Sequence, residues 1–340
     1  MSIAHCRFPN SFLVLPNTTY FFESTQTISN LFRIIRTFDC ADVATICLTP
    51  LGTFGFIFAD SSDLASITAL RFCGQGEVPQ KVIESENRIK ELQARRVLFI
   101  NFVSAVFFGR ITAKECRSLS GALYNGQDRI FEFDIIQNTV STQCTEKIGR
   151  IIEEKVSTLN TKRFRSNFLN ESTVDDAISY VQHALIRQKD FKCANFQSCM
   201  VMNYQAAILH NQQHFDASLA LNFVVIESLV REIFMAYGLI TSSTVQSFAT
   251  KQHNVLQISK TEFGKMNICK AIEKLYKGSL LSDDLHQRLN SIRKKRNTLL
   301  HEGKMISPGD SGECQTVVRD LWAFFLDDPF ELITSWSYVG

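Results

Sequence analysis

The chain has 340 residues, which is enough for two compact domains of about 150 residues each. Hydrophobic residues make up 45% of it and charged residues 21%, a composition of folded proteins that excludes an intrinsically disordered chain. The formal net charge is only +2, so no global electrostatic field favours nucleic acid, and such a partner needs a local basic patch.

Ten cysteines are scattered along the chain, and no two of them form a C-x-x-C pair. Metal clusters and redox motifs need closely spaced thiols, so we expect free, buried thiols in a reducing cytosol. The N-terminus shows no basic segment followed by an apolar one, which predicts no signal peptide. The longest apolar run, residues 97–109, is too short to span a bilayer, and the sequence predicts a soluble, cytoplasmic protein.

Residues 1–165 are predicted to form a mixed α+β domain of unknown role, either a sensor or a regulator. Residues 52–58 and 129–135 have the alternating pattern of strands. Residues 79–108 lack internal Gly and Pro and predict one long amphipathic helix, although its apolar second half could instead be a buried strand. The apolar stripe of this helix consists of Val82, Ile89, Leu92, Ile100, Val103 and Phe107.

A polar linker, residues 157–173, precedes a helical domain over residues 172–335, and the predicted fold class is mainly α. Helical periodicity predicts helices over residues 174–188, 198–212, 216–237, 267–276, 283–301 and 313–326. The first of these takes Ser172 or Thr173 as its cap. The helix over residues 216–237 is apolar on almost all sides, which is typical of the buried central helix of a bundle.

The helix over residues 283–301 carries the strongest functional pattern. Ser282 is a suitable N-terminal cap and Gly303 a suitable C-terminal stop. Its apolar stripe consists of Leu285, Leu289, Ile292 and Leu299. At 3.6 residues per turn, position 296 falls on this stripe, and it holds Arg296. A guanidinium on an apolar stripe must pair with an acid, meet an anion or lie at a subunit interface.

Asn297 and His301 are four residues apart, so they share one flank of the same helix, and the Arg296 side chain can reach that flank. An imidazole titrates near neutral pH and can exchange protons with a ribose 2'-hydroxyl or a leaving 5'-oxygen. A guanidinium can stabilise the extra charge of a phosphorane, and Asn297 can orient the imidazole or a phosphate oxygen. These groups predict RNA cleavage that needs no metal or cofactor.

The order Arg-Asn-x-x-x-His, near the end of a late helix in an all-helical domain, resembles the signature of the HEPN superfamily of ribonucleases. Glu227, in the predicted central helix, is similar to the acidic residue of that family's buried helix. The resemblance covers residues 172–330. It implies a bundle that dimerises, so that two copies of the Arg296/His301 helix form one site that leaves a 2',3'-cyclic phosphate on RNA. It also implies a toxin, an antiphage defence protein or an RNA-processing factor.

Local charge agrees with an RNA partner. Between Lys265 and Lys304 there are ten basic and four acidic residues, so this segment carries +6 while the whole chain carries +2. Arg293, Lys294 and Lys295 lie beside the predicted catalytic residues and are predicted to bind RNA. The alternative for Lys294 and Lys295 is an ordinary solvated basic face.

Three other groups are weaker candidates. His210 and His214 are four residues apart and could share a helix face as metal ligands, although no acidic residue lies between them. Glu227 and Arg231 are expected to form a buried ion pair, unless Glu227 supports the catalytic site from behind. The segment Lys162-Arg163-Phe164-Arg165 alternates basic and aromatic residues and could contact RNA.

The sequence therefore predicts a metal-independent endoribonuclease that acts as a homodimer on RNA, with a protein or phage-derived trigger sensed by the N-terminal domain. The alternative is a non-catalytic HEPN-like module for RNA binding or oligomerisation. A metal enzyme that uses His210 and His214 is the third hypothesis.

Overall fold

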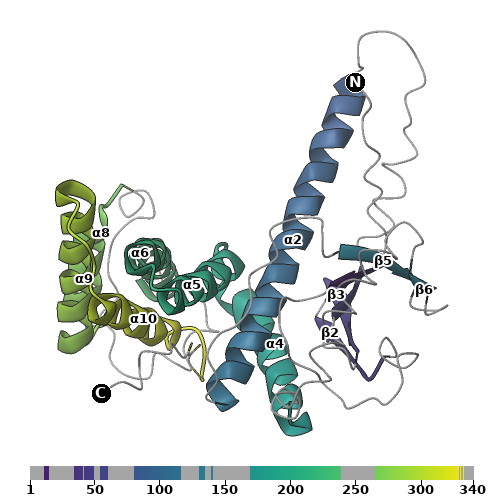
Figure 1. Ribbon diagram of the computed structural model, residues 1–340. Coiled ribbons are helices and arrows are strands. Elements are labelled where there is room, and N and C mark those ends of the chain that lie inside the picture. Colours follow the sequence, from purple (N-terminus) through teal and green to yellow (C-terminus); the bar gives the residue numbers. More distant parts are fainter. Residues whose placement is uncertain are drawn as a thin grey trace. The chain divides into compact units, whose positions relative to one another are not determined.

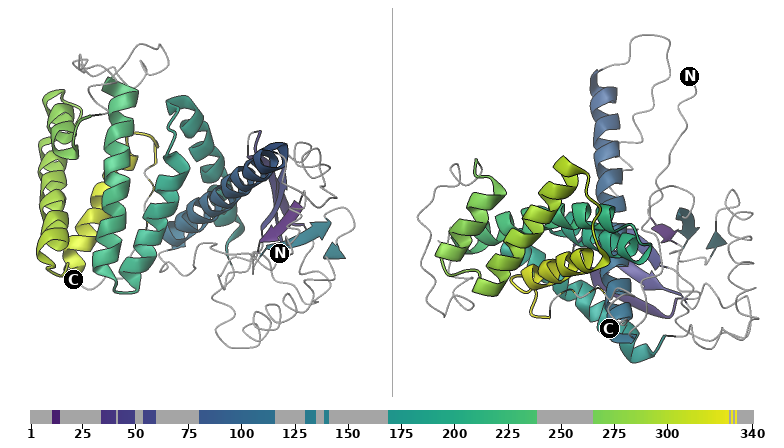
Figure 2. Two further views of the ribbon diagram at one scale, coloured as in Figure 1. Left: turned by 90° about the horizontal axis from the view of Figure 1, so that it is seen from above. Right: turned by 60° about the vertical axis from the view of Figure 1, so that its left-hand side comes forward.

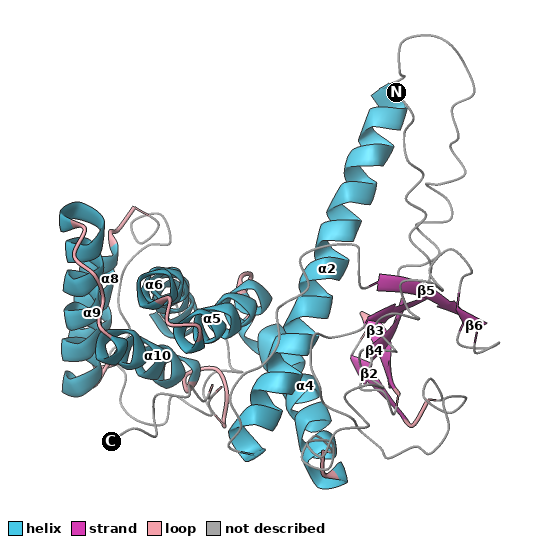
Figure 3. Cartoon of the chain, in the orientation of Figure 1, coloured by secondary structure: helices cyan, strands magenta, loops and turns pink. Residues whose placement is uncertain are grey.

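The structure is a computed structural model, and most of the residues that it describes are helical (Figures 1 and 3), which confirms the predicted fold class, mainly α. The described residues are 11–14, 34–40, 42–49, 54–59, 80–115, 130–134, 139–140, 169–238, 265–328, 330 and 332. The chain forms two compact units, one of residues 1–103 with 121–182 and one of residues 104–120 with 183–340. Helices α2 (Gln80–Glu115) and α4 (Glu171–Phe191) each contribute to both units, whereas the sequence analysis placed one boundary at residues 157–173.

The first unit contains an antiparallel sheet with the strand order β2-β3-β4-β1-β5-β6. Its strands are β1 (Ser11–Val14), β2 (Arg36–Cys40), β3 (Ala44–Leu48), β4 (Phe54–Phe58), β5 (Ile130–Asp134) and β6 (Thr139–Val140). In the central register Phe38 pairs with Ile46, which in turn pairs with Phe56. The strands predicted over residues 52–58 and 129–135 are confirmed as β4 and β5. The others were not predicted individually.

Aromatic packing holds α2 on this sheet. Phe56 and Phe58 of β4 are buried, and Phe99 of α2 meets both rings edge-on, at centroid distances of 6.4 and 5.9 Å. Residues 80–115 are helical throughout, so the alternative of a strand in the apolar second half is wrong. The helix also extends beyond its predicted end at residue 108. Because the helix buries Ile100, Val103 and Phe107, the apolar stripe is a core-facing one over this part.

The segment Lys90–Lys114 of α2 is long and apolar enough to cross a membrane by length and composition. This segment is longer than the apolar run from which the sequence analysis excluded a membrane span. Most of its apolar part is buried within the protein, and buried core helices meet the same criteria of length and composition. The cytoplasmic location stays a prediction.

The second unit contains α5 (Phe196–Asn211), α6 (Phe215–Ile233), the π-helical turn η5 (Phe234–Gly238), α8 (Ile268–Lys277), α9 (Asp283–Glu302) and α10 (Pro308–Trp322). α6 contacts α5, α8, α9 and α10, which confirms its predicted central position. It is not covered on all sides, because Val224 is 46% exposed. Trp322 of α10 is fully buried and packs edge-on against Phe196 of α5, with ring centroids 5.2 Å apart. Figure 2 shows α8 beside α9 in two views.

Two helix starts differ from the prediction. α4 begins at Glu171, before either predicted cap, because the Asn170 side chain accepts a hydrogen bond from the Ser172 backbone N–H at 3.1 Å. The end of the predicted linker is therefore helical, and residues 157–168 lie outside the described residues. α10 begins at Pro308, five residues before the predicted start at residue 313. Ser307 and Asp310 form a capping box there, in which each side chain bonds the other's backbone.

The described cysteines are free, as predicted. Cys40, Cys47, Cys193, Cys199 and Cys314 are buried and Cys269 is half-buried. Burial raises the pKa of Cys47 to about 11 and that of Cys199 to about 12, so these thiols stay protonated at neutral pH.

A buried polar seam joins α5, α6 and α10. Asn203 donates to Asn222 at 3.0 Å, and Ser218 donates to the Ala206 carbonyl at 2.8 Å. The buried His210 is hydrogen-bonded through Nδ1 to the Ser311 hydroxyl at 2.9 Å, and its Nε2 has no hydrogen-bond partner. Burial lowers the pKa of His210, because the charged imidazole would lose its hydration there.

The protonation of His210 should make the stability of the helical unit depend on pH. The pKa of His210 in the folded protein is lower than its value of about 6.5 in the unfolded chain. The unfolded chain therefore binds the proton at a higher pH, and the free energy of unfolding falls as the pH drops below about 6.5. We expect the thermal unfolding temperature of the full chain to fall between pH 7.5 and 5.5, and His210→Gln to reduce that fall. His214→Gln, at an exposed position, is the control. An undiminished pH dependence in His210→Gln would contradict this assignment.

Candidate nucleic-acid site on helix α9

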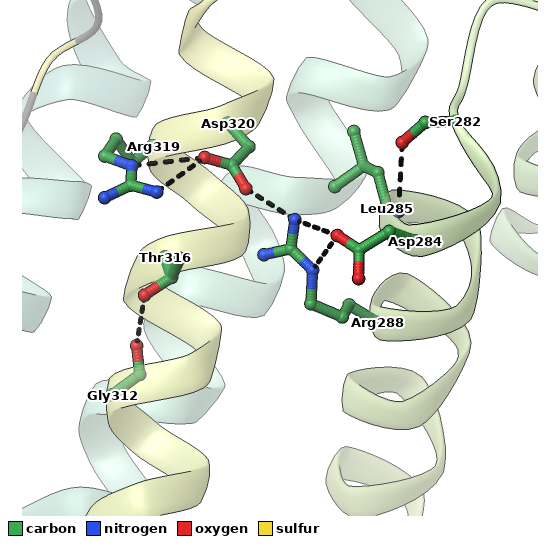
Figure 4. Close-up of polar contacts among 8 residues, drawn as sticks. All are labelled: Ser282, Asp284, Leu285, Arg288, Gly312, Thr316, Arg319 and Asp320. Carbon is green, nitrogen blue, oxygen red and sulfur yellow. Dashed lines mark hydrogen bonds and ion pairs between the residues drawn. The ribbon is translucent and has the colours of Figure 1, made fainter.

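Helix α9 begins and ends as its sequence predicts. The Ser282 hydroxyl accepts a hydrogen bond from the Leu285 backbone N–H at 3.2 Å (Figure 4), and Asp283 and Asp284 occupy the first turn. Gly303 ends the helix with a φ of 65°, a left-handed conformation that glycine adopts without strain. Within these limits Leu285, Leu289 and Ile292 are buried, so the position of Arg296 on the same stripe is fixed by the core.

Arg296 lies over an aromatic ring of the central helix. Its guanidinium carbon is 5.1 Å from the centroid of Phe223 on α6, a distance at which a cation is attracted by the ring face. The Arg296 side chain is half-buried, and no carboxylate of the described residues lies within 4.0 Å of it. Of the three environments predicted for this cation, pairing with an acid is therefore not found in the described chain. The charge remains available to an anion.

Asn297 contacts Arg296 rather than His301. Arg296 Nη1 donates to Asn297 Oδ1 at 3.3 Å, a long hydrogen bond between neighbouring side chains. His301 follows Asn297 by one turn on the same flank and is exposed, with no hydrogen bond to any described residue. The structure thus brings Arg296 and Asn297 into contact. It leaves the imidazole of His301 free to meet a ligand or a second chain.

Lys295 and Arg288 join α9 to α10. Lys295 Nζ lies 2.6 Å from Asp310 and 2.7 Å from Glu313. Burial alone would lower the pKa of Lys295, but its hydrogen bonds to these two carboxylates outweigh that effect and raise it. Arg288 lies between Asp284 and Asp320, at 2.7 and 2.6 Å (Figure 4). Lys295 is therefore occupied within the protein, unlike a free phosphate-binding lysine.

The three residues predicted to bind RNA are Arg293, Lys294 and Lys295, and of these only Lys295 has carboxylate partners among the described residues. Lys294 is exposed and has no partner among the described residues. Arg293 is half-buried, and its Nε donates to Asn290 Oδ1 at 3.4 Å. Lys304, at the end of the basic segment, pairs with Glu302 at 2.8 Å. Because three of the ten cations of this segment have carboxylate partners, the local basic patch is smaller than its formal charge of +6 suggests.

Glu227 does not form the predicted buried ion pair. Arg231 is exposed, and no bond between the two side chains is present. The exposed Arg231 guanidinium stays hydrated and does not enter a buried pair. Glu227 is half-buried and follows Phe223 by one turn, and no hydrogen bond or ion pair joins it to Arg296.

The histidine pair is not arranged as the metal site that was considered as a weaker alternative. His210 is buried and bonded to Ser311, whereas His214 is exposed and caps α6 after α5 has ended. The two side chains therefore do not share a helix face. No group of three His, Cys, Asp or Glu side chains in the described part of the chain is arranged to hold a metal ion. Residues 162–165 lie outside the described residues.

A polar cluster that was not predicted from the sequence lies where α8 meets α9. His286 Nε2 is 2.8 Å from Glu273 Oε1 and 3.1 Å from Asn290 Nδ2. The Tyr276 ring stacks on the His286 ring, with centroids 4.0 Å apart and planes 9° apart. The available sequence pattern was the recurrence of polar residues on one flank of α9, at His286, Asn290, Arg293, Asn297 and His301.

No protein-family model, no curated protein and no solved structure matches this chain. The candidate site therefore depends on its own geometry and on the motif.

Removal of Arg288 should loosen α9 on α10. Arg288→Ala deletes the ion pairs with Asp284 and Asp320, and we expect the free energy of unfolding to fall by about 1 to 2 kcal/mol. Urea denaturation of the full chain measures this change. Lys294→Ala removes an exposed cation of the same helix and should change stability by less than about 0.5 kcal/mol. Equal effects of the two substitutions would show that these ion pairs do not stabilise the protein.

Proposed function

We propose that the protein is a metal-independent endoribonuclease whose helical unit is a HEPN-like bundle with its site on α9. The observation that carries this proposal is the half-buried Arg296 guanidinium, which lies on the Phe223 ring without a carboxylate partner in the described chain. A cation in such a place attracts a phosphate more strongly than a fully solvated one, because the surrounding dielectric is lower. The bundle supports it through the central helix α6, which supplies Phe223.

The reaction that fits these groups is attack by the ribose 2'-hydroxyl on the adjacent phosphorus. The His301 imidazole accepts the 2'-hydroxyl proton, the 2'-oxygen bonds to phosphorus, and the bond from phosphorus to the 5'-oxygen breaks. The leaving oxygen takes a proton from a general acid, which gives a 2',3'-cyclic phosphate and a 5'-hydroxyl. Arg296 stabilises the negative charge of the phosphorane, and Asn297 orients the guanidinium.

One chain supplies one imidazole at this site, whereas the reaction uses a base and an acid. A second copy of the chain, placed so that its own α9 faces the first, supplies the other imidazole. Leu300, directly before His301, is 55% exposed, and Met305, four residues after it, is 87% exposed. Contact with a second subunit at this end of α9 would remove both side chains from water.

A non-catalytic RNA-binding or oligomerisation module is the second candidate. The exposure of His301, which no described side chain orients, favours it. This candidate keeps the RNA contacts of Arg296 and Arg293 and predicts no chemistry. The biological role proposed with the active form is that of a toxin or antiphage effector, with the N-terminal residues as the sensor of its trigger.

The replacement of His301 by Ala should abolish RNA cleavage. We expect cleavage of a single-stranded RNA to fall at least about 100-fold, the usual contribution of a general acid or base, and EDTA to leave the wild-type rate unchanged. Electrophoresis of end-labelled RNA measures both rates and identifies the cyclic phosphate. His214→Ala, which alters another exposed histidine, should retain full activity. Equal cleavage by His301→Ala would exclude the assigned role, and RNA binding without cleavage by the wild type would favour the second candidate.

Subunit mixing tests the composite site. When wild-type and His301→Ala chains pair at random in equal amounts, about a quarter of the dimers contain two wild-type chains. A site that needs both imidazoles therefore predicts about a quarter of the wild-type activity per total protein. Independent sites predict about half. Activity measured on co-expressed, co-purified chains distinguishes the two, with equal mixing verified by mass spectrometry.

A further inference from the structure

We propose that Arg293 binds a second phosphate of the RNA strand, next to the scissile one, and that Glu273, His286 and Asn290 are positioning residues for this contact. The inference rests on the proposed function, because it assigns a role to a second guanidinium of the same helix flank. It makes the substrate a strand with at least two consecutive phosphodiesters.

The Glu273 carboxylate determines the orientation of the Asn290 amide. The Glu273 carboxylate lies 2.8 Å from His286 Nε2, and the Asn290 amide nitrogen Nδ2 lies 3.1 Å from that same His286 atom. The hydrogen bond from His286 is the main reason that the pKa of Glu273 is lowered, so this carboxylate is ionised at neutral pH. An ionised carboxylate accepts from N–H groups only, and it therefore attracts the NH₂ side of the amide. This directs Asn290 Oδ1 toward Arg293, whose Nε donates to it at 3.4 Å.

The His286 ring is held on its face as well as at its edge. The Tyr276 ring lies parallel to it at 4.0 Å, and the Tyr276 hydroxyl donates to Asp283 at 2.9 Å. Both rings therefore have fixed planes, which keeps His286 Nε2 directed at Glu273. The contacts run from α8 to Arg293 through one carboxylate, one imidazole and one amide.

Arg293 has N–H groups that are not used by the described part of the protein. Its Nε is occupied by Asn290, while Nη1 and Nη2 have no hydrogen-bond partner among the described residues, and no described carboxylate pairs with it. A guanidinium held by Nε presents its outer N–H groups in one direction, a geometry that suits two oxygens of a phosphate. Neither neighbouring cation has this combination, since Lys294 is exposed and unheld and Lys295 is bound to Asp310 and Glu313.

Arg293 lies on the same helix flank as the proposed catalytic groups and precedes them. It precedes Arg296 by three residues and Asn297 by four, so it lies one turn before them on the side of α9 that leads to His301. The helix rises by about 12 Å between Arg293 and His301. A phosphodiester that reacts between Arg296, one turn from Arg293, and His301, about two turns from it, is therefore roughly 8 Å along the helix from Arg293. The next phosphate along the strand is the group that Arg293 can reach.

The test uses the full chain and a 2'-O-methyl RNA trinucleotide, which cannot react because its attacking hydroxyls are blocked. Two analogues replace either the first or the second phosphodiester with an uncharged methylphosphonate. We expect one of these replacements to weaken wild-type binding about 10-fold and to leave the affinity of Arg293→Gln unchanged. Asn290→Leu should show an intermediate, roughly 3-fold, effect of the same replacement. Lys294→Gln is the matched control, with the same charge change one residue away, and should respond as the wild type does.

The inference would be overturned if each methylphosphonate weakened RNA binding by Arg293→Gln as much as binding by the wild type. It would also be overturned if Lys294→Gln removed the effect of a replacement as fully as Arg293→Gln does. Absence of trinucleotide binding would overturn it too. Cleavage of unmodified RNA is measured in parallel. If Arg293→Gln removes the effect of one methylphosphonate but no RNA is cleaved, the phosphate contact stands and the proposed enzyme is excluded. If RNA is cleaved but Arg293→Gln does not remove that effect, the enzyme stands and the phosphate contact is excluded.

Discussion

The rotation of α9 about its own axis determines which of its side chains can meet a ligand. Leu285, Leu289 and Ile292 fix one face against the core of the helical unit. The ion pairs of Arg288 and Lys295 fix the next face against α10. Only the remaining flank is left for other contacts. Because two independent sets of contacts define this rotation, the positions of Arg293, Asn297 and His301 follow from the fold as a whole.

Local sequence patterns predicted most of the helical unit. The bounds of α5, α8 and α9 agree with the predicted helices to within about two residues, since caps such as Ser282 and stops such as Gly303 act over a few neighbouring residues. The start of α10 was missed because Pro308, Gly309 and Gly312 are poor helix formers. The capping box of Ser307 and Asp310, supported by packing of Val317 and Leu321, outweighs their low propensity.

The candidate site was predictable as a set of residues but less so as a set of contacts. The periodicity of α9 placed Arg296 on the apolar stripe, and its position over Phe223 follows from that. The partners of Lys295 lie on α10, and those of His286 lie on α8. Contacts between helices depend on how the helices pack, which periodicity within one helix does not contain. For the same reason a charge count along the sequence overestimates the free cations of α9.

The environment of Arg296 explains how a helical core holds a cation without a described carboxylate beside it. Contact with the Phe223 ring and a long hydrogen bond to Asn297 replace part of the lost hydration. Each of these is worth on the order of 1 kcal/mol, whereas removal of one partner of a buried ion pair costs roughly 3 to 5 kcal/mol. Weak partners are readily exchanged, so a phosphate that approaches Arg296 displaces little. A carboxylate at the same place would hold the guanidinium as firmly as Asp310 and Glu313 hold Lys295, and it would compete with the phosphate. The difference between these two cations on one helix is the physical reason why we propose an anion site at Arg296 and none at Lys295.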